Sequence, residues 1–263
     1  MEVIIRPDSA SACRLVSQLV ASHLRHKSDS VLGLATGRTM EQVYAELVRM
    51  HHEEGLDFSF CRTFNLDEYV GLDPKDPHSY RHYMNEHLFS RINIDIRNTH
   101  LPRGMAEDLQ AECRRYENLI RSDGGIDLQL LGIGESGHIG FNEPMSSLRS
   151  RTRDKCLTPS TIAVNSVLFG DEPHRMPKRA LTMGVGTILD AKEVVLLATG
   201  PKKASIIARA IEGPVTSMVT ASALQLHPAC KVIVDEAAAK ELTATDYYRW
   251  IFENEPEWAL YRN

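Results

Sequence analysis

The sequence lacks the features that mark membrane, exported and nucleic-acid-binding proteins. It has no apolar run of roughly 18 residues, and its N-terminus has no charged region followed by an apolar stretch. Lys and Arg number 30 against 35 Asp and Glu, so the net charge is −5 and no basic excess attracts nucleic acid or an anionic membrane. We therefore expect a soluble, unexported protein with neither nucleic acid nor membrane as a partner.

Cysteine is also scarce, and no two cysteines stand in a Cys-x-x-Cys pair. The five that occur are an odd and scattered set, which predicts neither a disulfide framework nor a zinc site and favours a reducing cytoplasm. No composition shift, internal repeat or low-complexity linker divides the chain. We expect a single domain over residues 1–263.

Short apolar runs alternate with amphipathic segments along the chain. Strands are expected at 31–35, 63–66, 127–131, 194–198 and 231–234. Helices are expected at 12–24, where Asp8 or Ser9 is the cap, and at 40–50, 80–88, 109–120 and 204–211. This alternation predicts an α/β fold of three layers, a doubly wound, mostly parallel, Rossmann-like sheet with helices on both faces.

The loop after the strand at 127–131 carries a histidine and a carboxylate five residues apart, His138 and Glu143. Loops at the carboxyl ends of parallel strands are where open α/β sheets bind ligands. An imidazole and a carboxylate in such a loop are typical of acid–base catalysis. We predict that the chemistry takes place here.

Two other interpretations of this loop are weaker. Residues 132–137 fit the dinucleotide pattern G-x-G-x-x-G, but Gly140 and Pro144 interrupt the helix that should follow, and no acidic residue ends a second strand about 20 residues on. His138 and Glu143 could also bind a metal, yet no third ligand stands at a typical spacing. We therefore expect no cofactor and no metal.

Two further strand ends carry groups suited to a phosphate. Thr36, Gly37, Arg38 and Thr39 place a hydroxyl, a guanidinium and backbone N–H groups at a helix start, and residues 199–203 repeat this design with Lys203. The alternative is a turn in which Gly37 supplies an unusual conformation and Thr39 caps the helix. A lysine in a first helical turn is poorly placed unless an anion lies there, so two such loops favour a phosphate.

Asp67 follows the strand at 63–66, where a carboxylate would point into the crevice above the sheet. A partly desolvated Asp could act as a general base toward a carbon or hydroxyl proton. The alternative is that Asp67 caps a helix or turn, which is the commoner role for a lone Asp after a strand.

Four segments make the sequence resemble the glucosamine-6-phosphate deaminases. The resemblance runs from the N-terminus to about residue 245, and the segments are Phe-Asn-Leu-Asp-Glu-Tyr-Val-Gly-Leu at 64–72, Gly-His-Ile-Gly-Phe-Asn-Glu-Pro at 137–144, Ser-Arg-Thr-Arg at 150–153 and Leu-Thr-Met-Gly-Val-Gly-Thr at 181–187. The first two are specific to that family. The related 6-phosphogluconolactonases share the Gly-His loop only, whereas the galactosamine-phosphate isomerases are closer and remain an alternative.

The resemblance implies a metal-free reaction of amino-sugar catabolism, in which glucosamine 6-phosphate and water give fructose 6-phosphate and ammonia. It implies that His138, oriented by Glu143, opens the sugar ring and that Asp67 moves a proton from C2 to C1. It assigns the phosphate to the backbone N–H groups of Arg38 and Thr39 and to the side chain of Lys203.

The chain departs from the family pattern at two positions near this site. Where the family has Asp or Asn beside the histidine, this chain has Ser136, which brings no charge, so its part in ring opening is open. Where the family has an arginine that grips the phosphate, this chain has Val167. We hypothesise that Arg38 replaces that guanidinium from the opposite loop.

Positions that bind an effector in allosteric, hexameric members of the family are also retained. They match Ser146, Arg153 and Lys155, although Cys156 stands where those members have Thr. The alternative is that Arg151 and Arg153 are solvated charges on a loop. A homo-oligomer is expected if the effector site is used, with a hexamer as the family's form.

Two functions of different classes follow. One is the deaminase; the other is a sugar-phosphate-sensing domain that kept the fold and lost catalysis. The changes at Ser136 and Val167 favour the sensor. The retained Asp67, His138 and Glu143 favour catalysis, and the sequence leaves the preferred C4 epimer and the subunit count open.

Overall fold

A seven-stranded parallel sheet forms the centre of the computed structural model, which describes residues 1–170 and 176–262 without the side chains of 167 and 168. Its strand order is β1-β10-β9-β6-β2-β3-β5, and every neighbouring pair is parallel. The strands are β1 (Glu2–Arg6), β2 (Val31–Leu34), β3 (Arg62–Asn65), β5 (Thr99–His100), β6 (Leu128–Leu131), β9 (Glu193–Ala198) and β10 (Cys230–Asp235).

Helices cover both faces of this sheet, as the alternation of strands and helices predicts. The helices are α1 (Ser9–His26), α2 (Arg38–Glu54), α3 (Tyr80–His87), α4 (Leu109–Ser122), α5 (Pro159–Asn165), α6 (Val185–Leu189), α7 (Ala204–Ile211) and α8 (Thr245–Asn254). Six 3₁₀ segments join them in the described residues, η1 (Phe89–Arg91), η2 (Ile96–Asn98), η3 (Ser166–Phe169), η4 (Pro201–Lys203), η5 (Thr220–Leu226) and η6 (Pro256–Tyr261).

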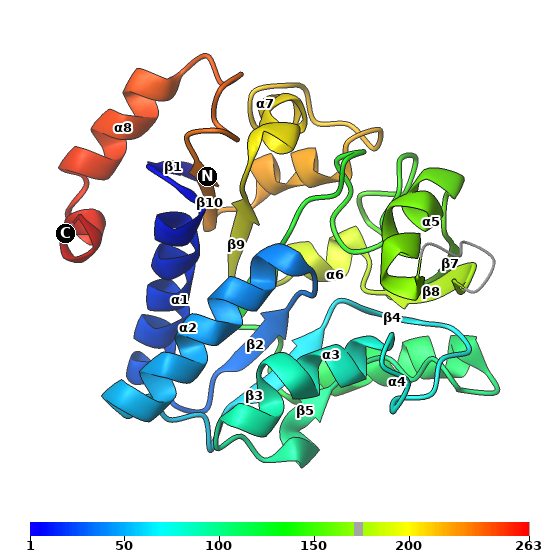
Figure 1. The fold of residues 1–263 in the computed structure, drawn as a ribbon. Helices are drawn as coiled ribbons and strands as arrows, with labels where there is room; N and C mark the ends of the chain where they lie inside the picture. The colour runs from blue at the N-terminus through cyan, green and yellow to red at the C-terminus, as the bar shows by residue number, and fades with distance from the viewer. Residues whose placement is uncertain (171–175, 263) are drawn as a thin grey trace.

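The two faces are covered by different helices. In Figure 1, α1 and α2 lie side by side in front of the sheet. Behind it, Tyr116 of α4 contacts the Phe64 ring at 5.7 Å and donates its hydroxyl to the carbonyl oxygen of Asn65 at 2.7 Å. With both faces covered, strands such as β6 and β9 are apolar and buried along almost their whole length.

A second, three-stranded antiparallel sheet lies beside the first. It has the order β4-β8-β7, with β4 (Asp67–Tyr69), β8 (Arg179–Thr182) and β7 (Arg153–Cys156), and it lies with α5 at the right of Figure 1. Only Leu66 separates β3 from β4, so the small sheet extends from the carboxyl end of β3. Asp67 pairs with Thr182 in its register.

The predicted fold class is confirmed, and all five predicted strands occur within a residue or two of their expected bounds. The structure corrects three details. Asp67 begins a strand of the second sheet instead of standing free after β3, α2 begins at Arg38 and ends at Glu54, and β1, β5, β7 and β8 were not predicted. Asp8 is the cap of α1, since its carboxylate accepts from Ser11 N at 2.7 Å. No helix in the described part of the chain is long and apolar enough to span a membrane.

Asp127, just before β6, ties the amino ends of three neighbouring strands together. Its carboxylate accepts from Val31 N at 2.8 Å, from Lys192 Nζ at 2.7 Å and from Lys27 Nζ, and its side chain is 3% exposed. Burial raises the pKa of Asp127, but these hydrogen bonds outweigh burial and lower it to about 2. The ionised carboxylate therefore stabilises the folded state.

We predict that Asp127→Asn lowers the free energy of unfolding by about 2 kcal/mol at pH 7. Because the pKa of Asp127 is lower in the folded than in the unfolded state, this stabilisation is complete above about pH 4 and is lost as the pH falls toward 2. Chemical denaturation at pH 7 and pH 3 measures it. The exposed Asp29→Asn is the matched control, and an equal cost in both variants, or one independent of pH, contradicts the prediction.

Candidate active site

Three loops meet at the carboxyl ends of β9, β6 and β2, which are adjacent in the sheet. From β2 the chain proceeds to β3 and β5 on one side, and from β6 it proceeds to β9 and β10 on the other. Such a reversal of the strand order is the usual position of the ligand site in an open α/β sheet. The loop after β6 carries the predicted acid–base pair. The loops after β2 and β9 carry the groups that are predicted to bind the phosphate.

In the loop after β6, the structure brings His138, Glu143 and Ser136 together. Glu143 Oε2 lies 3.1 Å from His138 Nδ1, and Ser136 Oγ lies 2.8 Å from Nδ1 and 3.3 Å from that carboxylate oxygen. Since Nδ1 faces a carboxylate, it carries the proton and donates it, which leaves Nε2 as an acceptor. The ring is thus held in the tautomer that a general base needs.

Glu143 is ionised although it is buried. Its side chain is 7% exposed, and burial alone would raise its pKa. Hydrogen bonds from His138, Thr161 and Thr158, together with the charge attraction of His138, reverse this effect and lower the pKa of Glu143 to about 2. A permanent negative charge therefore faces the imidazole and favours its protonated form during proton transfer.

The His138 ring lies directly against Gly134. A Cβ atom on Gly134 would lie 2.1 Å from His138 Nε2, and Gly134 N donates to the His138 carbonyl oxygen at 2.9 Å. Gly132, two residues earlier, has open space, since a Cβ there would meet only Met40 Cε at 3.9 Å. Gly134, the second glycine of the G-x-G-x-x-G pattern, is therefore needed so that the imidazole can lie against the backbone. No helix directly follows this loop, so the helix that a dinucleotide site requires is missing.

Asp67 faces the same loop from the small sheet. A Cβ atom on Gly140 would lie 3.7 Å from Asp67 Oδ2 and 2.9 Å from Thr182 Oγ1, which accepts from Phe141 N at 3.0 Å. Burial, and then the neighbouring carboxylate of Glu68, raise the pKa of Asp67 to about 8. A carboxyl with such a pKa exchanges protons near neutral pH.

The capping role considered for Asp67 is taken at α3 by Ser79, the N-cap residue, together with Glu68, the neighbour of Asp67. The Glu68 carboxylate accepts from Tyr80 N and Arg81 N, both at 3.0 Å, at the start of α3. Burial raises the pKa of Glu68, while the backbone donors lower it. Asp67 is thus left to face the loop.

The two predicted phosphate loops have the same backbone design. Gly37 precedes α2 with φ 117°, and Gly200 precedes η4 and α7 with φ 87°; neither start has a side-chain cap. Of the alternative interpretation of the first loop, the unusual conformation at Gly37 is confirmed, but the cap by Thr39 is wrong, because α2 begins at Arg38 directly after Gly37. Uncapped N–H groups at helix starts bind anions. The hydroxyl-bearing Thr36 is half-buried, and Arg38 is exposed.

Lys203 connects the third loop to the first. Its ammonium donates to the carbonyl oxygen of Ile133 at 2.6 Å, and Ile133 belongs to the loop of His138. Burial lowers the pKa of Lys203, and the Glu135 carboxylate partly opposes this. The Val167 side chain lies outside the described part of the structure, so the replacement of its missing arginine by Arg38 stays a hypothesis.

Of the residues of the predicted effector site, Ser146 lies further along the loop of His138, and Arg153 and Lys155 lie in β7, which follows that loop. Ser146 is buried, and its N–H donates to the Glu143 carbonyl oxygen at 3.0 Å. Arg153 Nη1 donates to Asn142 Oδ1 at 2.9 Å, and Lys155 lies two residues further along β7. Arg153 is therefore a half-buried strand residue, which contradicts the alternative that it is a solvated charge on a loop, whereas Arg151 is exposed and lies outside the strand, as that alternative states.

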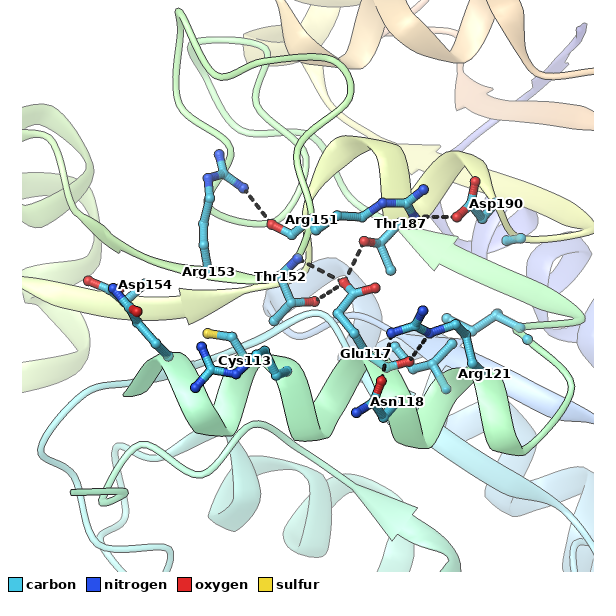
Figure 2. Close-up of a pocket in the computed structure, with 16 residues that line it drawn as sticks. Cys113, Glu117, Asn118, Arg121, Arg151, Thr152, Arg153, Asp154, Thr187 and Asp190 are labelled. Atoms are coloured by element: carbon cyan, nitrogen blue, oxygen red, sulfur yellow. Dashed lines mark hydrogen bonds and ion pairs between the residues drawn. The ribbon is translucent and has the colours of Figure 1, made fainter. Parts of the chain in front are cut away.

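Arg153 also borders a cavity of about 650 Å³ between α4, α6 and the start of β7 (Figure 2). In the cavity, Glu117 Oε1 accepts from Thr152 N at 2.8 Å and from the hydroxyls of Thr152 and Thr187, both at 2.6 Å. Figure 2 shows these three side chains pointing toward one another, with Arg151 paired to Asp190 at the edge. None of the predicted catalytic or phosphate-binding residues lines this cavity.

Sequence reasoning missed two hydroxyls that contact Glu143 and a left-handed backbone position two residues after it. Thr158 Oγ1 and Thr161 Oγ1 donate to Glu143 Oε1, the first at 3.2 Å. Met145 is the only non-glycine residue with positive φ in the described chain, at 72°, and its N donates to Ser217 O at 2.8 Å. Thr-Pro-Ser-Thr at 158–161 has the form of a helix start, but a capping pattern does not reveal a carboxylate partner elsewhere.

The fold and the site define the class of protein. The model of the family described as glucosamine-6-phosphate isomerases/6-phosphogluconolactonase matches residues 8–237, and the chain belongs to this family.

Particular relatives narrow the class. A glucosamine-6-phosphate deaminase of Arthrobacter sp. (strain FB24) is 49% identical over 98% of this chain and 99% of its own length. Glucosamine-6-phosphate deaminase 2 of Giardia intestinalis is 51% identical over 90% of each chain. Among solved structures, a monomeric glucosamine-6-phosphate deaminase superposes with a TM-score of 0.90 at 43% identity, covering 92% of this chain and 100% of that one. A 6-phosphogluconolactonase from Trypanosoma cruzi, at 18% identity and a TM-score of 0.72 over 92% of this chain and 97% of its own, shares the fold.

The geometry of Asp67 predicts a pH-dependent cost in stability. Because its pKa is higher in the folded than in the unfolded state, the folded state binds the proton more tightly, and stability falls as the pH rises from about 4 to about 8. Asp67→Asn should therefore raise the free energy of unfolding at pH 8, on the order of 2–5 kcal/mol, and change it little at pH 4. Denaturation at both pH values measures this. Equal stabilities at pH 8 contradict it.

Proposed function

We propose that this chain is a glucosamine-6-phosphate deaminase, which converts glucosamine 6-phosphate and water to fructose 6-phosphate and ammonia. The observation that carries the proposal is the convergence of His138, fixed by Glu143, and Asp67 from the small sheet on one loop. Relatives about 50% identical over nearly the whole chain are named for this activity. The alternative of a non-catalytic sensor is not favoured.

His138 would open the pyranose ring. Its Nε2 takes the proton of the anomeric hydroxyl and returns it to the ring oxygen as the C1–O5 bond breaks, which yields the open-chain aldehyde. Glu143 keeps Nδ1–H oriented and stabilises the transient imidazolium. Ser136 donates to Glu143, so its role in ring opening is indirect.

Asp67 would carry the isomerisation. Its carboxylate takes the C2 proton while O1 gains one from the ammonium group on C2, giving a neutral enolamine, and Asp67 then delivers its proton to C1. The resulting imine at C2 adds water, and the C2–N bond breaks to release ammonia. These steps need no redox partner and no cofactor, since every proton moves between the substrate, water and these side chains.

The phosphate would lie between the loops after β2 and β9. The backbone N–H groups of Arg38 and Thr39 stand at the start of the 17-residue helix α2, and Lys203 supplies a cation from the other side. Arg38 adds a guanidinium, which we infer replaces the arginine side chain that is missing at Val167. The anionic end of the sugar would then lie at helix starts beside the loop of His138, to which Lys203 is joined through the Ile133 carbonyl oxygen.

The direct test is an enzyme-coupled assay for fructose 6-phosphate. The wild-type chain should turn over glucosamine 6-phosphate, and galactosamine 6-phosphate measured alongside decides the C4 epimer. Asp67→Asn should nearly abolish turnover while binding remains measurable, since a general base typically supplies about 10²–10⁴-fold. No turnover of either sugar by a folded wild-type chain refutes the proposal.

Regulation, assembly and location stay predictions. An effector site at Ser146, Arg153 and Lys155 would lie next to the catalytic loop, since Arg153 bonds Asn142, the neighbour of Glu143. The solved relative with a TM-score of 0.90 is monomeric, whereas the hexamer belongs to allosteric members. Sedimentation with and without an N-acetylated sugar phosphate tests both, and a cytoplasmic location is proposed from the five free cysteines.

We predict that Gly134→Ala reduces kcat by about 10²-fold or more, because its Cβ would occupy the space of His138 Nε2. Gly132→Ala, in the same loop, should leave kcat within about twofold, since among the described residues a Cβ there would meet just the Met40 methyl, at 3.9 Å. The coupled assay measures both variants. Equal activities would mean that the imidazole position does not govern turnover.

We predict that Arg38→Ala raises KM for the sugar phosphate about tenfold with little change in kcat, because a charge-assisted bond to phosphate contributes equally before and during the chemical step. Arg91→Ala, which removes an exposed arginine outside these loops, is the control. Inorganic phosphate as a competitive inhibitor should weaken in parallel. An unchanged KM contradicts the hypothesis that Arg38 replaces the arginine missing at Val167.

A further inference from the structure

The Glu143 carboxylate has a separate set of partners on each oxygen. Oε2 faces His138 Nδ1 at 3.1 Å and Ser136 Oγ at 3.3 Å. Oε1 accepts from Thr158 Oγ1 at 3.2 Å and from Thr161 Oγ1. The histidine's partner is thus held from its far side by two hydroxyls.

Both hydroxyls come from the start of α5. Thr158 is the N-cap of this helix, and its Oγ1 accepts from Thr161 N at 3.2 Å. Thr161 lies one turn into the helix and is buried, at 6% exposed. It is not the cap, so its hydroxyl has no need to bond outside the helix for α5 to form.

A buried carboxylate can turn about its side-chain bonds unless each oxygen is engaged. Bonds from hydroxyls to an ionised oxygen are about twice as strong as neutral ones, and the two threonines supply them, the buried Thr161 and the half-buried Thr158. With Oε1 fixed, Oε2 stays within reach of the imidazole. Without these bonds, the same carboxylate could rotate toward the open side of the loop.

We propose that the Thr158–Thr161 pair positions the general base of the reaction: acting through Glu143, it fixes the Nδ1–H tautomer and the orientation of His138 for opening the sugar ring. The inference rests on the proposed function for its kinetic consequence. Its structural consequence, the state of the imidazole, does not need turnover. Thr161 is a positioning residue because it reaches the substrate only through two other side chains.

The alternative is that Thr161 only stabilises α5. The two roles differ in what they affect. A positioning role lowers kcat and leaves the phosphate loops intact, so an open-chain analogue that needs no ring opening binds as before. A structural role weakens binding and stability together, and a smaller side chain does not restore them.

The central experiment compares Thr161→Val, which keeps the shape and removes the hydroxyl, with Thr161→Ser, which keeps the hydroxyl. The valine variant should lose about 10- to 100-fold in kcat with KM within about twofold, and the serine variant should keep most of the activity. Val164→Thr makes the reverse exchange at an exposed position of α5 and is the matched control. Calorimetric binding of 2-amino-2-deoxyglucitol 6-phosphate should be the same in all of them.

Two further measurements isolate the route through Glu143. Adding Thr161→Val to Glu143→Gln should cost little more than Glu143→Gln alone, because both changes break one chain of contacts. Long-range ¹H–¹⁵N spectra of the imidazole should show a fixed Nδ1–H tautomer for His138 in the wild type and in Thr161→Ser, and a mixture in Thr161→Val. The spectra need only the folded chain.

The outcomes separate the two claims. Full activity and an unchanged His138 spectrum in Thr161→Val overturn the positioning role. Additive losses in the double variant also overturn it. So does weakened binding of the analogue to Thr161→Val that Thr161→Ser does not restore. If the wild type turns over neither sugar phosphate but the spectra change as expected, the proposed function fails and the positioning role stands. If Thr161→Val does not fold, the role is judged on Thr158→Val, whose Oγ1 contacts the same oxygen.

Discussion

The site depends on keeping one buried carboxylate charged. Glu143 is almost fully enclosed, and an isolated carboxylate in such a place would take up a proton. Donors on both of its oxygens prevent this, and they come from different segments, the loop after β6 and the start of α5. The charge therefore has two effects: it orients the imidazole, and it holds the start of α5 against the loop of His138.

Asp67 illustrates the opposite use of burial. It is equally enclosed, but none of the described residues donates a hydrogen bond to its carboxylate, and the acid Glu68 is its neighbour. Burial and this second carboxylate raise the pKa of Asp67 to about 8, whereas the pKa of Glu143 is lowered to about 2. The pKa values of these two buried carboxylates thus differ because Glu143 has hydrogen-bond donors that Asp67 lacks among the described residues. One stays an anion that orients and the other is poised to accept and give back a proton, which is the division of labour that acid–base catalysis requires.

The sequence predicted the main sheet well because its strands are short apolar runs followed by helices, and local patterns reveal both. The small sheet escaped prediction for a physical reason. β7 reads Arg-Asp-Lys-Cys and β4 has three residues, so neither has the composition or length of a strand, and each exists only because β8 pairs with it across a long stretch of chain. Motif and resemblance supplied His138, Glu143 and Asp67. The hydroxyls of Thr158 and Thr161 could not be found, because their partner lies 15 to 18 residues away and is set by tertiary packing.

The small sheet explains how an α/β crevice can be completed from outside the main sheet. A loop after β3 could place an acid near the site, but a loop carboxylate would be solvated and its pKa would stay low. Pairing Asp67 with Thr182 buries the acid in a strand, and Thr182 Oγ1 also accepts from Phe141 N, so the same residue fixes the loop of His138. The placement of Asp67 relative to the loop of His138 is thereby set by one strand register, and a shift of one residue would turn Asp67 to the other face of the sheet. Precision at this site thus comes from long-range pairing of short polar strands, which is also the part of the fold least visible in the sequence.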